Sequence, residues 1–419
     1  MQWHGQTKAV IISADKYSGP PWHSASVAGF RSPLLPISRD HIKMRIFLLL
    51  SLFLAGLAQA APDVSVRSLL FQGKNERGDT PAISMPFVTM NDQKVAAKIN
   101  DYLFIRQIGV LAPKQPGKFF SAAGGDRIAG MASLEYTVSR NDGRVLTIAF
   151  AGEGCGAYCE DYNTFYSFDI KTGRMLGADD LFTVPGMRSL AQKLSKERQS
   201  QYRQQLISLR KELKAAQKER KPKNQDAIDD LNNRIALNAD CLGEGSDSAG
   251  TPAADLSLST FRNYMSELAG QAFNLTAGRC SNHAMRALDD VGEVTLTLPY
   301  AELKPYLTGY GKALLLGEGS GVPKSGVYGQ LLHGQMGGKI AITMLLHKES
   351  DNSVGGVYFY DKYRKPINVS GGETGDTIAL TEDAAEGSTG KATMHLAISG
   401  DRLQGQWSGK TELHVELAP

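Results

Sequence analysis

The spacing of apolar residues in the first part of the chain predicts two strands followed by a helix. Residues 64–71 and 83–90 have the composition of strands, and the apolar residues between 95 and 108 then recur near helical spacing. Asn91-Asp92 precedes this helical stretch, at the place where a short polar side chain caps the first turn of a helix. We therefore expect an amphipathic helix that ends near Leu111.

A β-hairpin is predicted after this helix. Residues 134–138 and 145–150 are strand-like and flank Asn141-Asp142-Gly143, whose residue types tolerate the positive φ of a tight turn. A further strand is expected at 164–170. A helix packed on an antiparallel sheet belongs to the α+β class, which is the fold predicted for residues 61–316.

Residues 187–255 interrupt this pattern with a polar, charge-rich insertion. Leu206, Leu209 and Leu213 recur at helical spacing, a break follows at 221–223, and the spacing resumes at 228–235. An antiparallel helical hairpin is the predicted structure. Two interpretations stay open: a solvated insertion whose narrow apolar seam joins its own two helices, or an arm that binds a partner or a second copy.

The chain then returns to the α+β pattern. Residues 243–254 are rich in Gly, Ser, Thr and Pro and are expected to form a flexible loop. A helix around 258–272, a strand at 294–298 and a short helix at 300–307 are predicted next. The Gly- and Ser-rich segment 317–326 is the best candidate for a linker between two domains.

After this linker, strand-like runs recur at short intervals. Turn residues such as Gly371-Gly372 and Gly400-Asp401 separate them, and no helix-length pattern intervenes. The eight runs are 327–333, 339–348, 356–360, 367–370, 377–381, 392–399, 403–408 and 413–417. They predict a small all-β meander barrel, or a sandwich, over residues 327–419. A barrel of eight strands is either filled by its own side chains or holds one small ligand, and the sequence is compatible with both.

A secretory signal peptide is predicted at residues 44–60. Met44-Arg45 is followed by the apolar run 46–57 and by small residues up to Ala60, where cleavage is expected. The run is too short for a bilayer, which needs about 20 residues, so we expect export to the periplasm without stable membrane insertion. Residues 1–43 are then expected to be an over-extended translation start.

The charge balance argues against nucleic acid as a partner. The whole chain carries a formal charge of +3, but residues 61–419 contain 40 Lys and Arg against 41 Asp and Glu, a charge of −1. A near-neutral mature chain lacks the basic surface that binds phosphate backbones or anionic lipid.

The four cysteines, Cys155, Cys159, Cys241 and Cys280, are expected to form disulfides in an oxidising compartment. The favoured pairing joins Cys155 to Cys159 and Cys241 to Cys280, because the first two lie four positions apart on a Gly-containing loop. The alternative is a tetrahedral zinc site in which His283 joins three of the cysteines. Because exported thiols oxidise, no metal and no cofactor is expected.

Acidic residues near the first cysteine pair are the main candidates for chemistry. Glu160, Asp161 and Asp169 could form an acid/base pair or a cation site, although acidic residues at turns are more often solvated or capping groups. The chain contains no His-Glu-x-x-His, no Gly-x-Ser-x-Gly and no phosphate loop. We therefore expect no catalytic residue and predict binding by Tyr158, Glu160 and Asp161.

Aromatic residues of the C-terminal segment are a second set of candidates. Tyr358, Tyr360 and Tyr363 could line a sugar- or ligand-binding mouth, since flat rings with a polar group suit partly wet sites. Alternation along a strand places Tyr358 and Tyr360 on the face opposite Phe359. Phe359 and Trp407 are expected in the core. The four histidines of this segment, including His333, are expected to be surface or packing residues.

A family resemblance is carried by four segments of the chain. They are Gly154-Cys155-Gly156-Ala157-Tyr158-Cys159, the run 166–176, Asp179-Asp180-Leu181-Phe182 and residues 298–307. They resemble the extracellular domain of RsiV-type anti-sigma factors, which also accompanies some peptidoglycan deacetylases of the PdaC type. The resemblance implies an α+β domain and, in the RsiV branch, a surface that binds lysozyme. It implies no active site. Because a transmembrane segment, a sigma-binding part and a deacetylase domain are not recognised, their functions are not carried over.

These observations predict a periplasmic, non-catalytic binding protein with two folded domains. The expected partner is an envelope component, either a lysozyme-like protein or peptidoglycan. One alternative is an enzyme that acts on envelope carbohydrate through carboxylates near Glu160 and Asp169. The other is a barrel that carries a small apolar ligand.

Overall fold

The computed structural model describes residues 64–74, 78–121, 128–156, 158–218, 225–244, 261, 264–349, 351–383 and 392–419. The predicted signal peptide at 44–60 and the extension at 1–43 lie outside the described residues, and so do the break at 221–223 and most of the loop at 243–254. Among the residues that are described, no helix is long and apolar enough to cross a membrane.

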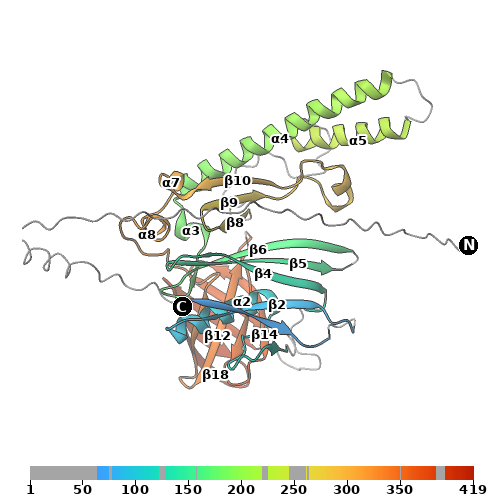
Figure 1. The fold of residues 1–419 in the computed structure, drawn as a ribbon. Helices are drawn as coiled ribbons and strands as arrows, with labels where there is room; N and C mark the ends of the chain where they lie inside the picture. Colours follow the sequence, from blue (N-terminus) through green and yellow to red (C-terminus); the bar gives the residue numbers. More distant parts are fainter. Residues whose placement is uncertain are drawn as a thin grey trace, which may run out of the picture. The chain divides into compact units, whose positions relative to one another are not determined.

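A seven-stranded sheet forms the first layer, in the order β3-β1-β2-β4-β5-β6-β7 (Figure 1). Its strands are β1 (Ser65–Phe71), β2 (Ala82–Thr89), β3 (Phe119–Phe120), β4 (Met131–Asn141), β5 (Val145–Cys155), β6 (Cys159–Asp169) and β7 (Arg174–Met175). The sheet is mixed rather than wholly antiparallel as predicted, because β1 pairs with β3 and β2 pairs with β4 in parallel. A helix crosses over between β2 and β4, and such a crossover returns the next strand in the same direction.

That helix is α2 (Gln93–Ile108), and both of its ends are defined by the expected chemistry. Asp92 Oδ1 accepts hydrogen bonds from the backbone N–H groups of Lys94 and Val95, which confirms the predicted cap. Gly109, at φ 75°, ends the helix in the left-handed conformation that favours glycine. α2 is buried on most of its surface because the sheet packs on one side and strands of the C-terminal barrel on the other.

The predicted hairpin turn at Asn141-Asp142-Gly143 is confirmed, with Gly143 at φ 82°. Beyond it, β5 and β6 form a hairpin much longer than predicted. Their register runs from Val145 opposite Asp169 to Cys155 opposite Cys159, where a disulfide closes the end of the hairpin.

A second, three-stranded antiparallel sheet has the order β10-β9-β8. Its strands are β8 (Met265–Leu268), β9 (Ala272–Ala277) and β10 (Val294–Pro299), and short helical segments lie nearby: α3 (Ala178–Leu181), η3 (His283–Leu288), α7 (Tyr300–Leu303) and α8 (Gly309–Leu316). The helix predicted around 258–272 is therefore wrong over 265–268 and at Ala272, which are strand. Phe273, Leu275 and Ala277 are buried at every second position because one face of this sheet packs against α4.

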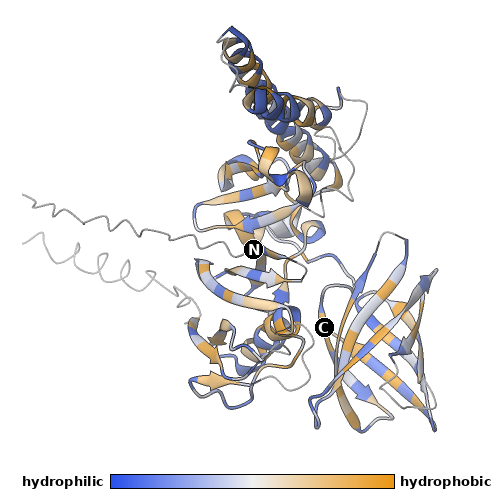
Figure 2. Ribbon diagram, turned by 90° about the vertical axis from the view of Figure 1, so that its right-hand side faces the viewer, coloured by the Kyte–Doolittle hydropathy of each residue, from blue (hydrophilic) through white to orange (hydrophobic). Residues whose placement is uncertain are grey.

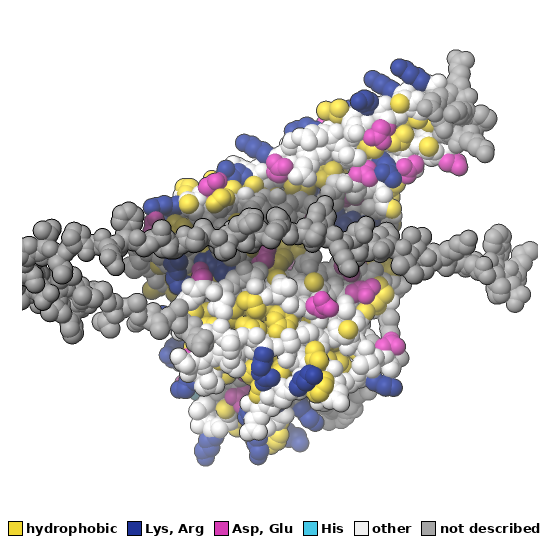
Figure 3. Space-filling model, viewed as in Figure 1, with side chains coloured by type: hydrophobic (Ala, Val, Ile, Leu, Met, Phe, Trp, Pro, Cys, Tyr) yellow, Lys and Arg dark blue, Asp and Glu magenta, His cyan; other side chains and the backbone are white. Residues whose placement is uncertain are grey.

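The predicted helical hairpin consists of α4 (Val184–Lys218) and α5 (Gln225–Cys241), which lie side by side in Figure 1. Leu190 and Leu194 near the start of α4 pack into the core beside the three-stranded sheet, so the base of the arm is part of the domain. Farther along, Figure 3 shows basic and acidic side chains together on the arm.

The C-terminal segment is a closed barrel of eight antiparallel strands. They are β11 (Leu331–Met336), β12 (Ile340–Lys348), β13 (Ser353–Tyr360), β14 (Pro366–Thr374), β15 (Thr377–Glu382), β16 (Thr393–Ser399), β17 (Arg402–Ser408) and β18 (Glu412–Ala418). β18 pairs with β11, so the segment is a barrel and not a sandwich. Apolar and polar residues alternate along its strands (Figure 2), and its interior holds the buried side chains Leu332, Met336, Ile342, Met344, Leu346, Val354, Tyr358, Val369, Ile378, Leu380, Met394, Leu396, Leu403, Val415 and Leu417.

The outside of the barrel is buried as well, on the side that faces α2. Leu331, Leu345 and Phe359 point outward from the barrel and belong to the same core as α2 and the seven-stranded sheet. Phe359 has no exposed surface. The first domain and the barrel therefore share an apolar core.

Candidate functional site

The sequence-predicted site residues lie in three separate places. Tyr158, Glu160 and Asp161 are at the end of the β5–β6 hairpin. Tyr358 and Tyr360 are associated with the barrel core, and the remaining candidate, Tyr363, lies on the β13–β14 turn. They do not form one site.

Both predicted disulfides are present, and they exclude the zinc alternative. Cys155 is bonded to Cys159 and Cys241 to Cys280. Ligand atoms of Glu153, Cys155 and Cys159 lie within 4.8 Å of one another. Because the two sulfurs share a disulfide, neither is the thiolate that zinc requires.

Tyr158 at the end of the hairpin stacks on His283 of η3. The ring centroids are 3.5 Å apart, the planes differ by 11°, and Tyr158 is 53% exposed. Asn282 caps η3 by accepting a hydrogen bond from the backbone N–H of Met285. The sequence suggested His283 as a zinc ligand together with the cysteines. His283 does lie beside the first cysteine pair, but its contact there is the aromatic stacking on Tyr158.

Glu160 lies between two basic side chains of η3. Its Oε1 is 3.5 Å from His283 Nδ1 and 3.5 Å from Arg286 Nη1, and all three side chains are 39–47% exposed. Exposed pairs of this kind stabilise a fold by at most about 1 kcal/mol. They fix the side chains without removing them from solvent. Tyr158, Glu160, His283 and Arg286 are called the tip surface below.

A buried polar network holds η3 in place. The Tyr202 hydroxyl donates to Asp289 Oδ1 at 3.1 Å and accepts from the backbone N–H of Cys280 at 3.3 Å. Burial acts to raise the pKa of Asp289, but hydrogen bonds from the backbone N–H groups of Gly292 and Ser281 outweigh it, so the pKa is lowered. With the disulfide from Cys280 to α5, this network makes η3 a fixed platform beside the hairpin.

The hairpin end is acidic on both faces. Glu153 and Asp161 are paired directly across β5 and β6, so they share one face, and Glu160 lies on the other. Like charges placed opposite each other on a sheet destabilise it. Arg286 and His283 are the basic side chains that lie close to Glu160. Three carboxylates and two basic side chains therefore meet at the hairpin end.

The barrel tyrosines differ from this exposed surface. Tyr358 is fully buried, and its hydroxyl donates to Glu382 Oε1 at 2.5 Å; Trp407 Nε1 donates to the same oxygen at 2.7 Å. Tyr360 is partly buried beside them. Tyr358 is thus a core residue, contrary to its choice as a binding residue. Alternation correctly placed it opposite Phe359, but both faces of β13 are buried here.

Two adjoining cavities lie where the barrel meets the first domain, and they share Leu111, Pro113 and Arg364 in their walls. The larger, called the aromatic cavity, has a volume of about 750 Å³. The smaller, called the polar cavity, has about 330 Å³. Together they form the interdomain cleft. The β13–β14 turn, residues 361–365, lines both, so Tyr363 was the one barrel candidate placed at this cleft.

A chain of hydrogen bonds crosses the barrel side of the polar cavity. Thr343 Oγ1 donates to Asp361 Oδ1 at 2.8 Å, and His333 Nδ1 lies 3.1 Å from Thr343 Oγ1. Because the hydroxyl proton goes to Asp361, Nδ1 of His333 is the donor and Nε2 carries the lone pair. His333 lines the cleft and part of its surface is exposed there. The protein packed around the rest of the ring lowers the pKa of His333 by desolvation, and the charge of Asp361 acts to raise this pKa. It is not an ordinary surface histidine.

Asp101 and Arg364 face each other from opposite walls of the polar cavity. Asp101 Oδ1 lies 3.7 Å from Arg364 Nη2 and accepts the backbone N–H of Ala112 at 2.9 Å. Arg364 Nη2 donates to the carbonyl oxygen of Ala112. Burial raises the pKa of Asp101 to about 6, with Arg364 and the Ala112 bond opposing the rise. Sequence reasoning missed both residues.

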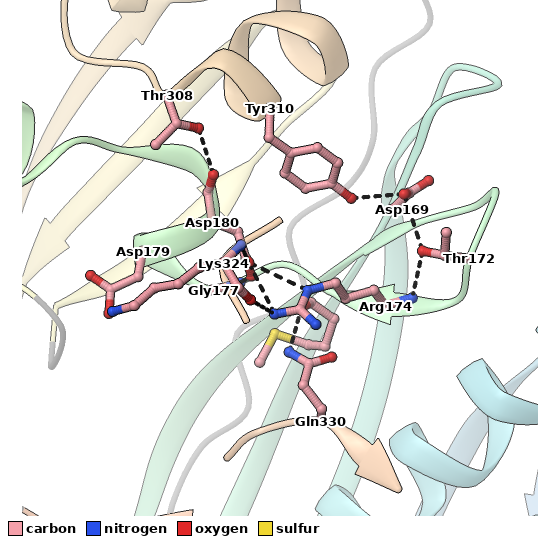
Figure 4. Close-up of polar contacts among 11 residues, drawn as sticks. Asp169, Thr172, Arg174, Gly177, Asp179, Asp180, Thr308, Tyr310, Lys324 and Gln330 are labelled. Carbon is pink, nitrogen blue, oxygen red and sulfur yellow. Dashed lines mark hydrogen bonds and ion pairs between the residues drawn. The ribbon is translucent and has the colours of Figure 1, made fainter. Parts of the chain in front are cut away.

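Figure 4 shows a second polar cluster, centred on the buried Asp180. Its Oδ1 accepts from Arg174 Nη2 at 3.1 Å and from the backbone N–H of Lys324 at 3.0 Å, and its Oδ2 accepts from the backbone N–H of Gly177 at 3.0 Å. The following Leu181 and Phe182 are buried as apolar anchors. The cluster fastens the linker before the barrel to β7 and α3.

Asp169 belongs to this structural region and not to the hairpin end. It accepts from the Tyr310 hydroxyl at 2.7 Å and from Thr172 Oγ1 at 3.1 Å (Figure 4). Glu160 and Asp169 lie at opposite ends of β6, about 30 Å apart at the rise of a strand. The structure does not bring Glu160 and Asp169 together, so these two residues do not form the acid/base pair that was considered as an alternative.

No protein-family model matches the chain, and no curated protein matches it significantly. Two solved structures are similar to part of it. A member of the DUF3298 family from Bacteroides fragilis has 14% sequence identity and a TM-score of 0.34, over 62% of this chain and 98% of that one. A DUF3298 family protein from Pseudomonas aeruginosa has 16% identity and a TM-score of 0.27, over 61% of this chain and 98% of that one. Likeness at this level assigns neither activity nor ligand.

Proposed function

We propose that this chain is an exported, non-catalytic binding protein that recognises a basic, lysozyme-like protein of the cell envelope through its tip surface. The observation that carries this proposal is the stacked, exposed pair of Tyr158 and His283, flanked by Glu160 and Arg286, on two segments that are each held by a disulfide. Tyr and Arg are the residues most enriched among interface hot spots.

Preorganisation supports this assignment. Binding costs free energy when side chains and loops must be ordered, and a surface already fixed avoids part of that cost. The disulfide from Cys155 to Cys159 fixes the hairpin end, and the one from Cys241 to Cys280 fixes the segment that carries η3. The exposed tip surface is therefore ready to bind without rearrangement.

Charge supports a basic protein as the partner. Glu160 lies in the tip surface beside Arg286 and His283, and Glu153 and Asp161 add two carboxylates on the opposite face of the hairpin end. Complementary charge speeds association and excludes partners of the same sign. The resemblance of 154–182 to RsiV-type extracellular domains adds lysozyme as the specific choice. Export and the oxidising compartment fit the two disulfides.

The test is surface plasmon resonance with the chain from Ala61 and egg-white lysozyme. We expect saturable binding that weakens as ionic strength rises. Tyr158→Ala and Glu160→Gln should each weaken binding about tenfold, a loss expected for a hot-spot residue. Glu302→Gln is the matched control, because Glu302 is an exposed glutamate on α7, outside the tip surface.

Three results would overturn the proposal. The first is that lysozyme binds neither the parent chain nor any variant at micromolar concentration. Glu302→Gln could weaken binding as much as Glu160→Gln, which would show an unspecific charge effect. Retention on insoluble peptidoglycan with no affinity for lysozyme would replace the protein partner by a glycan.

A further inference from the structure

We propose that the aromatic cavity binds a small amphiphile, namely a single acyl chain with an anionic head group. The apolar wall would receive the chain, and Arg364 and Lys365 would receive the anion. This site is independent of the tip surface.

The floor of the aromatic cavity is apolar and rigid. Phe104 and Phe120 pack edge to face with their centroids 5.4 Å apart, and both belong to the shared core. Val110 and Leu111 complete the floor, and both are buried. A volume of about 750 Å³ lies within the range of about 300–1,000 Å³ that is usual for small-molecule sites.

Two exposed aromatic rings stand at the walls of this cavity. Phe119 is 49% exposed and Tyr363 is 65% exposed. Large rings that remain in water beside an apolar floor provide additional surface for an acyl chain to cover. They come from the first domain and from the barrel, so a bound chain would contact both.

The anion-binding side is the β13–β14 turn. Arg364 adopts φ 58°, a left-handed conformation that costs a non-glycine residue free energy. Its Nη2 contacts Ala112 and Asp101, while no acceptor is seen for Nε or Nη1 within the described part of the chain. A guanidinium has five N–H donors in a planar fork that suits carboxylate or phosphate. The strained turn therefore directs a cation with spare donors into the cavity wall.

Lys365, next to Arg364, gives a second positive charge. It lines the same cavity and is exposed, and among the described residues it makes no hydrogen bond or ion pair. Among the described residues, Asp101 pairs with Arg364 at 3.7 Å, on the side of the polar cavity, which Asp361 also lines. The aromatic cavity itself has no acidic residue among its described lining residues. Its charge therefore favours an anion over a cation or a neutral head group.

The test is isothermal titration calorimetry of the chain from Ala61 with four ligands of equal chain length, each below its micelle concentration. They are dodecanoate, dodecyl phosphate, dodecanol and dodecyltrimethylammonium. Dodecanoate and dodecyl phosphate should bind at least tenfold more tightly than the other two, because charged hydrogen bonds discriminate by that factor. Octanoate should bind more weakly than dodecanoate, by up to about fourfold for each CH₂ removed. The two anionic ligands distinguish a carboxylate from a phosphate head.

Substitutions of residues that line the cavity test whether the ligand binds there. Arg364→Gln should weaken dodecanoate binding at least tenfold. Lys365→Gln should weaken it about threefold and leave the fold intact, because Lys365 is exposed and its side chain makes no hydrogen bond or ion pair with the described residues. Arg402→Gln is the matched control, since Arg402 is an exposed arginine on β17 that does not line the cavity.

The proposal is overturned if none of the four ligands gives a binding isotherm, or if dodecanol binds as tightly as dodecanoate. It is also overturned if Arg364→Gln and Lys365→Gln both retain the affinity of the parent chain, or if Arg402→Gln lowers it as much. Lysozyme binding by the tip surface is unaffected by any of these outcomes.

Discussion

At the tip surface two disulfides hold exposed polar side chains in place, whereas in the interdomain cleft a buried apolar core holds the walls. No described residue between 153 and 161 is buried. By contrast, Phe104 and Phe120 below the cleft are 0% and 5% exposed. The two candidate binding regions of this chain are therefore rigid for different physical reasons.

This difference follows from where each region lies relative to the hydrophobic core. The β5–β6 hairpin continues past Phe150 and Tyr162, the residues nearest its end that pack on the core of the seven-stranded sheet, so apolar packing contributes little to ordering its end. A disulfide orders such a segment mainly by restricting the unfolded chain. The cleft lies between two folded units, and its walls are ordered by burial of apolar surface. Substitutions in one region should therefore leave the structure and binding of the other region unchanged.

The largest effect is expected for Phe359→Ala, which removes the buried ring between the barrel and α2. Truncating a buried Phe creates a cavity and costs about 3–5 kcal/mol in the free energy of unfolding. Urea denaturation followed by circular dichroism measures this loss. Tyr363→Ala, at an exposed ring on the same side of the barrel, should change it by less than about 0.5 kcal/mol. Equal losses from the two variants would show that the barrel is not anchored through Phe359.

A smaller effect is expected for the double substitution Cys155→Ser with Cys159→Ser. The disulfide closes a loop with a sequence separation of 4, for which the loss of chain entropy corresponds to about 2 kcal/mol. The variant should lose affinity for lysozyme and keep its affinity for dodecanoate. Both affinities can be measured on one preparation by the assays above. A parallel loss of the two affinities would indicate that the tip and the cleft are not independent.

The sequence predicted the elements whose signals are local. The cap at Asp92, the turn at Gly143 and the eight barrel strands follow from residue type and spacing alone. The strand β9 was missed because its apolar residues between 272 and 277 become a buried face only when α4, distant in the sequence, packs on the sheet. Parallel pairing of β2 with β4 likewise depends on how α2 crosses the sheet.

The site residues show the same limit. Tyr158 and Glu160 could be identified from the cysteine loop, but His283 and Arg286 reach them from a segment far along the chain. For Tyr358 alternation gave the correct face, opposite Phe359, yet it could not show that this face of β13 points into the filled interior of the barrel.

Arg364 had no signal in the sequence. Its importance depends on a left-handed backbone and on the contact with Asp101 across the domain boundary. Neither property follows from residue type or local spacing.

The smallest effect is expected for Asp101→Asn, and it depends on pH. The folded chain raises the pKa of Asp101 from its usual value of 3.8 to about 6, chiefly by burial. Between these two values the folded state binds more protons than the unfolded state, so the contribution of this group to stability decreases as pH rises and is fully lost above about pH 6. Asn remains neutral and can still accept the backbone N–H of Ala112.

The Asn variant should therefore match the parent near pH 4 and exceed it above pH 6. A shift of this size corresponds to at most about 3 kcal/mol, and we expect about 1 kcal/mol because water reaches the carboxylate through the cleft. Urea denaturation at pH 4, 5.5 and 7 measures the difference. Asp376→Asn, at the exposed turn between β14 and β15, controls for the general loss of a negative charge. If Asp101→Asn is less stable than the parent at pH 7, the ion pair with Arg364 outweighs burial, and Asp101 anchors the cleft through charge.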